Sequence, residues 1–229
     1  MECLVVATHN PKKGVEMATI LKRLLPHLEI RTLAAFPAAP EPEESGGSYA
    51  DNAALKSEAA VLFTRLPSLA DDAGLEIDAL DGAPGLYSKR FGGEELPFDK
   101  KMARILELMK DVPGHERKAR FRCCIALSLP GSTHAFQRQW AEKLSRDEKL
   151  RVGNTYLLQA TCEGCIAFEP KGQGGFGYDP IFFLPELGRH MAELSPEEKH
   201  AVSHRGKVLR QFAKFVEEKG ITFSRRAEN

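Results

Sequence analysis

The alternation of apolar and polar positions divides the chain into short strands and amphipathic helices. An apolar run at residues 3–8 has the length and flanks of a buried strand. Asn10 and Pro11 follow as an N-cap and a first helical residue, and Pro26 ends the helix. The apolar residues of this helix recur at helical spacing: Met17, Ile20, Leu21, Leu24 and Leu25. The first 26 residues therefore predict a strand followed by a helix.

The middle of the chain continues this mixture. Residues 34–47 are rich in Ala, Pro, Glu and Gly and predict a loop, and Ser48 to Asp51 predict the cap of a second helix. Residues 67–80 predict two short extended stretches around an Asp-Asp pair, and a third helix follows. The second helix is expected to bury Leu55, Ala59, Leu62 and Phe63, and the third to bury Met102, Ile105, Leu106 and Met109.

The last hundred residues predict three strands and a closing helix. Residues 119–129 alternate strictly and predict a half-buried strand, and residues 156–168 and 181–184 predict two more. Ser195 to Glu198 has a helix cap with acids in the first turn. The final helix is expected to start at Ser203, to bury Val208, Leu209, Phe212, Phe215 and Val216, and to end at Gly220.

Strands and helices mix along the whole chain, which predicts the α/β class with a mixed central sheet flanked by helices. The length of 229 residues fits a single domain spanning 1–229, or two lobes that share a sheet. Residues 132–154 are hydrophilic and predict an insertion, with a helix expected around Trp140 to Leu150.

The charge balance and the composition limit which classes of binding partner and which cellular location are compatible with the sequence. Lys plus Arg equals Asp plus Glu, at 32 each, and this balance argues against a protein that coats nucleic acid. A small anionic ligand remains compatible, because it needs only a few cations in one place. The N-terminus has no signal-peptide pattern, and no apolar run approaches the ~20 residues of a membrane span. Five cysteines in a chain of this length predict reduced thiols and a cytoplasmic protein.

Two helix starts carry charges of the unfavourable sign. Lys12 and Lys13 follow the Asn10 cap, and His204 and Arg205 open the last helix. The N-terminus of a helix disfavours cations, so either these side chains extend into water or an anion lies between them and the free backbone amides.

Paired acids form a second candidate site. Asp71 and Asp72 follow a predicted strand, and adjacent residues of an extended chain point to opposite sides. One carboxylate could therefore face a site for a hard cation such as magnesium while the other braces it, or both could belong to a polar loop tip. Glu44, in the preceding loop, could add an oxygen ligand. Lys56 shares a helical face with Asn52 and points either to solvent or to this cation.

A glycine-rich loop is the third candidate. Residues 172–177 contain four glycines, which let backbone approach a ligand closely. Phe176 and Tyr178 offer flat surfaces on which a base could stack, or they anchor the loop to the core. Asp179 could accept hydrogen bonds from a base or a sugar. The Cys162–Cys165 pair has no second Cys/His pair to complete a zinc site.

Six motifs in order carry a family resemblance: THNPKK (8–13), the Asn52/Lys56 helix, LADDAGLEIDAL (69–80), GAPGLYSKRF (82–91), GGFGYDPIFF (174–183) and SHRGK (203–207). With them the chain resembles the inosine triphosphate pyrophosphatase family, also called the Ham1 or non-canonical purine NTP pyrophosphatase family. It is most similar to the bacterial dITP/XTP pyrophosphatase branch, over nearly its whole length except residues 132–154.

The resemblance implies a magnesium-dependent enzyme that hydrolyses ITP, dITP and XTP to the monophosphate and pyrophosphate. It implies a homodimer whose two lobes flank a cleft, with a small-molecule substrate and neither nucleic acid nor a membrane as partner. It also implies that Asp72 is the catalytic carboxylate and a Mg²⁺ ligand, with Asp71 and Glu44 as further metal-site carboxylates. The substrate-binding residues would be Thr8, His9, Asn10, Pro11, Lys12, Lys13, Lys56, Ala73, Phe176, Gly177, Tyr178, Asp179, Lys199, His204 and Arg205.

Within this set, Thr8, Asn10 and Lys13 would hold phosphates, and residues 176–179 would frame the base and sugar. Lys199, His204 and Arg205 would contact the base and donate to a purine 6-oxo group. Two positions depart from the family pattern. Ala73 stands where relatives commonly have a Ser that touches substrate, and His9 stands where they often have Gly.

Three other functions are compatible with parts of the pattern. A pyrophosphatase for other altered nucleotides, such as modified pyrimidines, would use the same chemistry. A non-catalytic nucleotide sensor is expected to lack one of the acids at 71 and 72, and both are present. An RNA-binding module is disfavoured by the neutral charge.

Overall fold

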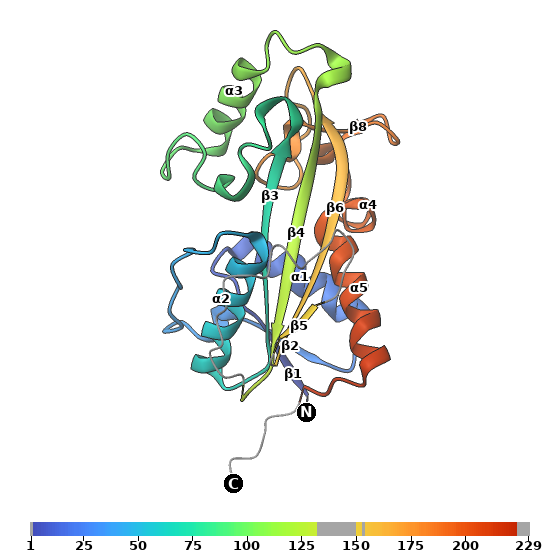
Figure 1. The fold of residues 1–229 in the computed structure, drawn as a ribbon. Helices are drawn as coiled ribbons and strands as arrows, with labels where there is room; N and C mark the ends of the chain where they lie inside the picture. Colours follow the sequence, from blue (N-terminus) through green and yellow to red (C-terminus); the bar gives the residue numbers. More distant parts are fainter. Residues whose placement is uncertain (1, 132–149, 153, 224–229) are drawn as a thin grey trace. The chain divides into compact units, whose positions relative to one another are not determined.

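The computed structural model describes residues 2–131, 150–152 and 154–223. It confirms the α/β class with a mixed sheet (Figure 1). The strands are β1 (Cys3–Val6), β2 (Glu29–Thr32), β3 (Ser68–Ile77), β4 (Lys118–Ser128), β5 (Leu150–Val152), β6 (Thr155–Ile166), β7 (Phe182–Leu184) and β8 (Arg189–His190). The helices are α1 (Pro11–Leu24), α2 (Tyr49–Thr64), α3 (Phe98–Leu108), α4 (Pro196–Val202) and α5 (His204–Lys219).

Hydrogen bonds join the strands in the order β2-β1-β3-β4-β6-β7-β8, and β5 pairs with β6. β1 runs parallel to β2 and β3, whereas β7 pairs antiparallel with both β6 and β8. The chain forms two compact units. Among the described residues, the first comprises 2–72, 123–131, 150–152, 154–160 and 205–223, and the second comprises 73–122 and 161–204.

The local start and stop signals of the helices are confirmed. Asn10 caps α1 by accepting a hydrogen bond from the Lys13 amide, and Pro11 is its first helical residue. Ser48 caps α2, and Ser195 forms a capping box with Glu198 at α4. The predicted inward face of α5 is buried along its whole length, and Gly220 follows the helix with a positive φ of 58°.

The predicted inward face of α2 is wrong. Leu62 and Phe63 are 43% and 44% exposed, and the buried face consists of small and polar side chains. Ala50, Ala53 and Ala54 of α2 pack against Cys124 and Ala126 of β4 and Leu157 of β6. Small side chains let a helix lie close to a sheet. Alanine residues therefore form the face of α2 that packs on the sheet, although hydrophobicity alone predicts leucine and phenylalanine there.

Two predictions about strands also need correction. The pattern at 119–129 predicted a half-buried strand, but β4 is buried on both faces from Cys123 to Ser128, because α2 covers its small-residue face. Residues 67–80 were expected to form two short stretches, but β3 runs without a break from Ser68 to Ile77. The two Asp residues therefore lie within a strand and not after one.

Most of the predicted insertion 132–154, including its expected helix, lies outside the described residues. Where it is described, Leu150 belongs to β5 and not to a helix, in antiparallel register with Leu157 of β6. The short strands β2 and β8 were not predicted from the sequence.

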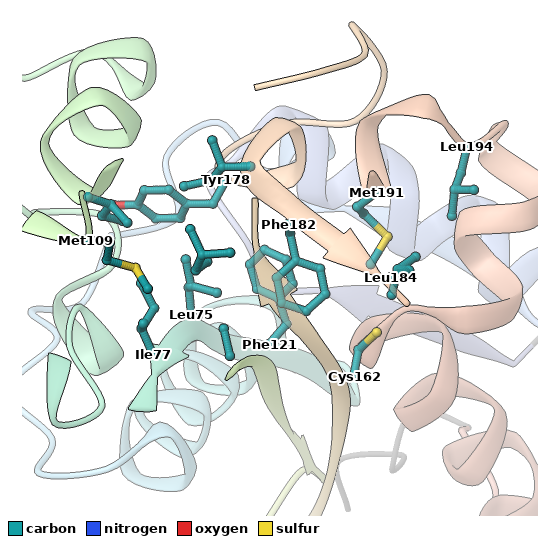
Figure 2. Packing of buried hydrophobic residues seen from close by; sticks show 14 residues of the cluster. Leu75, Ile77, Met109, Phe121, Cys162, Tyr178, Phe182, Leu184, Met191 and Leu194 are labelled. Atoms are coloured by element: carbon teal, nitrogen blue, oxygen red, sulfur yellow. The ribbon is translucent and has the colours of Figure 1, made fainter. Parts of the chain in front are cut away.

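The core of the second unit is a cluster of aliphatic, aromatic and sulfur-containing side chains (Figure 2). β3 contributes Leu75 and Ile77, and the rings of Phe121 from β4 and Phe182 from β7 lie 4.5 Å apart between centroids. Tyr178, from the glycine-rich loop, belongs to the same cluster. None of the described helices combines the length and the apolar character needed to cross a bilayer.

Candidate functional site

The turn after β1 is organised by its own side chains. The Thr8 hydroxyl accepts a hydrogen bond from the Asn10 amide at 3.2 Å, and Asn10 Oδ1 accepts one from the Lys13 amide at 3.1 Å. Lys12 and Pro11 are exposed, and the exposed His9 ring lies 3.3 Å from the carbonyl oxygen of Pro40. The turn thus presents exposed backbone at the N-terminus of α1, where partial positive charge gathers.

Asp71 connects the two helix starts that carry misplaced cations. Its Oδ2 atom lies 3.3 Å from Lys13 Nζ and 2.7 Å from Arg205 Nη2. Arg205 Nη1 in turn contacts Glu16 Oε2 at 2.7 Å, and the Arg205 side chain is 2% exposed. A carboxylate from β3 therefore balances the charges of Lys13 and Arg205, whereas Lys12 is exposed, as the alternative interpretation expected.

Only one oxygen of Asp71 takes part in these contacts. Oδ2 also lies 4.0 Å from the Cys123 thiol, whereas the buried Oδ1 atom has no hydrogen-bond partner among the described residues. Burial raises the pKa of Cys123 to about 12, so this thiol stays protonated. Asp71 Oδ1 is a buried acceptor with an unused capacity for a ligand.

Asp72 faces a different set of partners. Asn52 Nδ2 donates to its Oδ2 atom at 3.1 Å, and Lys56 Nζ donates to its Oδ1 atom at 3.0 Å. The same ammonium donates to Glu44 Oε1 at 3.2 Å, so Lys56 joins the loop before α2 to β3. The expectation that adjacent carboxylates point to opposite sides is confirmed by these separate partner sets.

The two acids have opposite pKa shifts. Burial would raise the pKa of Asp71, but the charges of Lys13, Arg205 and Lys56 outweigh it and hold that pKa well below its usual range. For Asp72 burial prevails over Lys56 and Lys13, and the pKa is raised. Burial also lowers the pKa of Lys56, but the surrounding carboxylates reverse this and raise it. Clustered shifts of this kind are typical of functional sites.

A second group of predicted site residues surrounds the glycine-rich loop. Asp179 Oδ2 accepts hydrogen bonds from the Phe176 amide at 2.8 Å and from Lys199 Nζ at 2.7 Å. The Lys199 ammonium also lies 4.5 Å from the centroid of the Phe176 ring. Gly175 has a φ of +69°, and a Cβ atom there would collide with the Asp179 carboxylate. Position 175 therefore requires glycine, because the Asp179 carboxylate lies against its backbone.

Tyr178 is not the exposed stacking surface that the sequence suggested. Its side chain is buried, its hydroxyl donates to the Ser88 carbonyl at 2.9 Å, and its ring lies in the core cluster. The alternative, that this aromatic residue anchors the loop, is the one the structure supports. Phe176 remains partly exposed, and Gly177, beside it, also has a positive φ.

The remaining predicted residues are placed as follows. His204 is buried, and its ring stacks on Phe121 with 4.9 Å between centroids. Ala73, the first residue of the second unit, is partly exposed on β3. Arg205 directs three guanidinium nitrogens at Asp71 and Glu16, so a base contact by this residue stays a prediction.

Sequence reasoning missed Glu16, which is the second carboxylate partner of Arg205. A signal was available, because Glu16 follows Lys13 by three helical positions and therefore shares its side of α1. Its partner Arg205 is 189 positions away, and nothing local announces that pairing.

The mixed sheet, with buried carboxylates that contact basic side chains beside a capped helix start, places the chain among α/β proteins with a charged candidate site. The family model of the Ham1 family matches residues 4–215, and the chain belongs to that family.

Named relatives agree over nearly the full length. The chain is 40% identical to a dITP/XTP pyrophosphatase of Geobacillus kaustophilus, covering 97% of this chain and 100% of the relative. It is 44% identical to the dITP/XTP pyrophosphatase of Geobacter sulfurreducens, over 91% and 94% of the two chains. Among solved structures, a Ham1 protein from Coxiella burnetii superposes with a TM-score of 0.78 at 35% identity, covering 95% of this chain and 100% of that chain.

Proposed function

We propose that this protein hydrolyses the non-canonical purine nucleoside triphosphates dITP, XTP and ITP to the monophosphate and pyrophosphate, and so removes deaminated purines from the nucleotide pool. The full-length similarity to dITP/XTP pyrophosphatases supports the substrate class. The observation that carries the chemistry is the Asp72 carboxylate, held by Asn52 and Lys56 within the same unit as the capped turn.

Magnesium is the proposed cofactor, with Asp72 and Glu44 as ligands and Asp71 beside them. No group of three or more His, Cys, Asp or Glu side chains in residues 2–131, 150–152 and 154–223 is arranged to hold a metal ion. Mg²⁺ nevertheless binds proteins through one or two carboxylates and takes its other ligands from phosphates and water. The donor chemistry fits, since Glu44 and Asp72 already share one cation, the Lys56 ammonium, and Asp71 Oδ1 is a buried acceptor without a partner. When bound, the ion would neutralise charge on the phosphate oxygens.

The reaction proceeds by attack of water on the α-phosphorus. A bond forms between the water oxygen and the α-phosphorus, the bond from that phosphorus to the bridging oxygen breaks, and pyrophosphate leaves. Asp72 accepts the proton of the attacking water. Asn52 donates to one of its carboxylate oxygens and Lys56 to the other, and these two hydrogen bonds fix the orientation of the carboxylate. Lys13 and Lys56 stabilise the charge that develops on the leaving pyrophosphate.

Recognition of the base is assigned to Phe176, Gly177, Asp179, Lys199, His204 and Arg205, on the basis of the family motifs. Donors that match a 6-oxo group would disfavour the 6-amino group of adenine. We further propose that the protein is cytoplasmic and forms a homodimer. Light scattering after size exclusion should then give a molar mass twice that of the 25.4 kDa chain.

A substrate panel tests the proposal. Purified protein is incubated with Mg²⁺ and dITP, XTP, ITP, dATP, dGTP or a modified pyrimidine triphosphate, and the products are identified. We expect kcat/KM for dITP and XTP to exceed that for the canonical nucleotides. Asp72→Asn should be inactive, and Asp111→Asn, at an exposed position, should match the wild type. Preference for a canonical or pyrimidine nucleotide would refute the assigned substrate class.

A further inference from the structure

Lys101, on α3, is a buried cation that the proposed chemistry does not use. Its side chain is among the largest fully buried ones, and its ammonium donates to the backbone carbonyl of Lys89. In the described part of the chain no carboxylate forms an ion pair with it, and its Nζ atom lies 5.1 Å from the centroid of the Phe98 ring. Burying an ammonium is costly unless it is hydrogen-bonded, and the Lys89 carbonyl supplies such a bond here.

That carbonyl belongs to a tightly bonded turn. The preceding carbonyl, of Ser88, accepts the Tyr178 hydroxyl at 2.9 Å. The Ser88 side chain accepts from the Leu75 amide at 2.9 Å and donates to the Gly85 carbonyl at 2.6 Å. Two successive carbonyls of one turn are thus held by side chains from two separate segments, α3 and the glycine-rich loop.

Phe98 closes this arrangement from the other side. Its ring meets the Tyr178 ring edge to face, with 5.2 Å between centroids and 81° between planes. A Cβ atom on Gly177 would lie 3.6 Å from Phe98 Cε1, so the loop backbone at this residue lies close to the ring. Lys101, Phe98, Tyr178 and Gly177 are therefore consecutive neighbours, and all belong to the second unit.

We propose that Lys101 and Phe98 are positioning residues for the glycine-rich loop, and that they set the affinity for the nucleoside part of the substrate. The inference rests on the proposed function, because it takes residues 176–179 as the base-recognition segment. Lys101 fixes the turn at residues 88–89, that turn fixes Tyr178 through its hydroxyl, and Phe98 supports Gly177. Phe176 and Asp179, the neighbours of these two anchored residues, are thereby held in one conformation before substrate binds. Preorganisation of this kind acts on binding more than on the chemical step.

The test compares Lys101→Met, which keeps the aliphatic stem, with Lys101→Arg, which keeps the charge and the donors. Lys100→Met, at an exposed position of the same helix, is the matched control. Steady-state kinetics with dITP should show about a tenfold higher KM for Lys101→Met, the effect of losing one charge-assisted hydrogen bond, with kcat within about twofold. Lys101→Arg should restore most of the affinity, and Lys100→Met should match the wild type.

Hydrogen exchange supplies a readout that needs no activity. Amides of residues 174–179 should exchange faster in Lys101→Met, while those around Asp71 and Asp72 keep their wild-type rates. Phe98→Leu, at an exposed position, should give the same pattern if Lys101→Met does not fold. Unchanged exchange at 174–179 in these variants, or an equal increase throughout the chain, would overturn the positioning role. A wild-type protein inactive on every nucleotide would refute the proposed function alone, because the exchange result stands apart from it.

Discussion

The burial of the Arg205 contacts leads to a prediction about stability. Arg205 and the exposed Arg189 each bind a glutamate at nearly the same distance, 2.7 Å to Glu16 and 2.6 Å to Glu198. The Arg205 side chain is 2% exposed and also holds Asp71, whereas Arg189 is 40% exposed. Both arginines bind a glutamate, but only Arg205 is buried and also holds a second carboxylate, so the pair of variants compares a buried network with an exposed ion pair.

Arg205→Met leaves two buried carboxylates without their guanidinium, and breaking a buried pair in this way costs about 3–5 kcal/mol. For a chain of this size, each kcal/mol lowers Tm by roughly 2–4 °C, so we expect a fall of roughly 6–20 °C. Arg189→Met removes a surface ion pair worth about 0–1 kcal/mol and should lower Tm by less than ~4 °C.

Calorimetry of both variants at one pH and salt concentration measures the difference. Adding Glu16→Gln to Arg205→Met should recover part of the lost Tm, because it removes one of the two buried negative charges that the Arg205 guanidinium neutralised. Equal Tm values for Arg205→Met and Arg189→Met would refute the reasoning that the Asp71–Arg205–Glu16 network is buried and interdependent.

Three further predictions concern the two candidate site regions. Lys56→Met should lower kcat for pyrophosphate release about 10²- to 10³-fold, which is the typical effect of losing one preorganised donor. Lys22→Met, at an exposed position of α1, should leave kcat unchanged. Equal activity of the two variants would remove Lys56 from the mechanism. Chelation with EDTA should abolish pyrophosphate release and excess Mg²⁺ should restore it; full activity after exhaustive chelation would exclude the proposed cofactor. Gly175→Ala should raise KM for dITP and lower Tm, because its Cβ would collide with the Asp179 carboxylate. Gly188 has a similar positive φ with open space around it, so Gly188→Ala should lower Tm only by the small cost of placing alanine in this backbone conformation. The same loss of Tm in both variants would show that the Asp179 carboxylate does not lie against Gly175.

Features with a local cause were predictable from the sequence. The caps at Asn10, Ser48 and Ser195 depend on side chains within three residues, and all three are confirmed. The inward face of α5 follows from strict helical spacing. In each case the residues that decide the structure are neighbours in the chain.

Features decided by distant partners were not predictable. Asp disfavours strands, so the pair at 71–72 suggested a strand end, yet contacts with Lys13, Arg205 and Lys56 stabilise both acids within β3. The exposed Leu62 and Phe63 show the same limit, because the close approach of α2 to the sheet selects alanine on its buried face.

The candidate site divides in the same way. The turn at residues 8–13 and the acids were located by rules of charge and spacing, but the sharing of Asp71 between two helix starts was not. The anchoring of Tyr178 depends on a turn 90 residues away, and no pattern near Tyr178 indicates it. Roles in base recognition stay predictions, since they come from family motifs and not from the contacts themselves.

The site of water attack tests the central claim most directly. Hydrolysis of dITP in ¹⁸O-labelled water, followed by mass spectrometry of both products, locates the oxygen that water contributes. Attack on the α-phosphorus predicts one labelled oxygen in the monophosphate and unlabelled pyrophosphate. Label in the pyrophosphate, or release of orthophosphate in its place, would contradict the account.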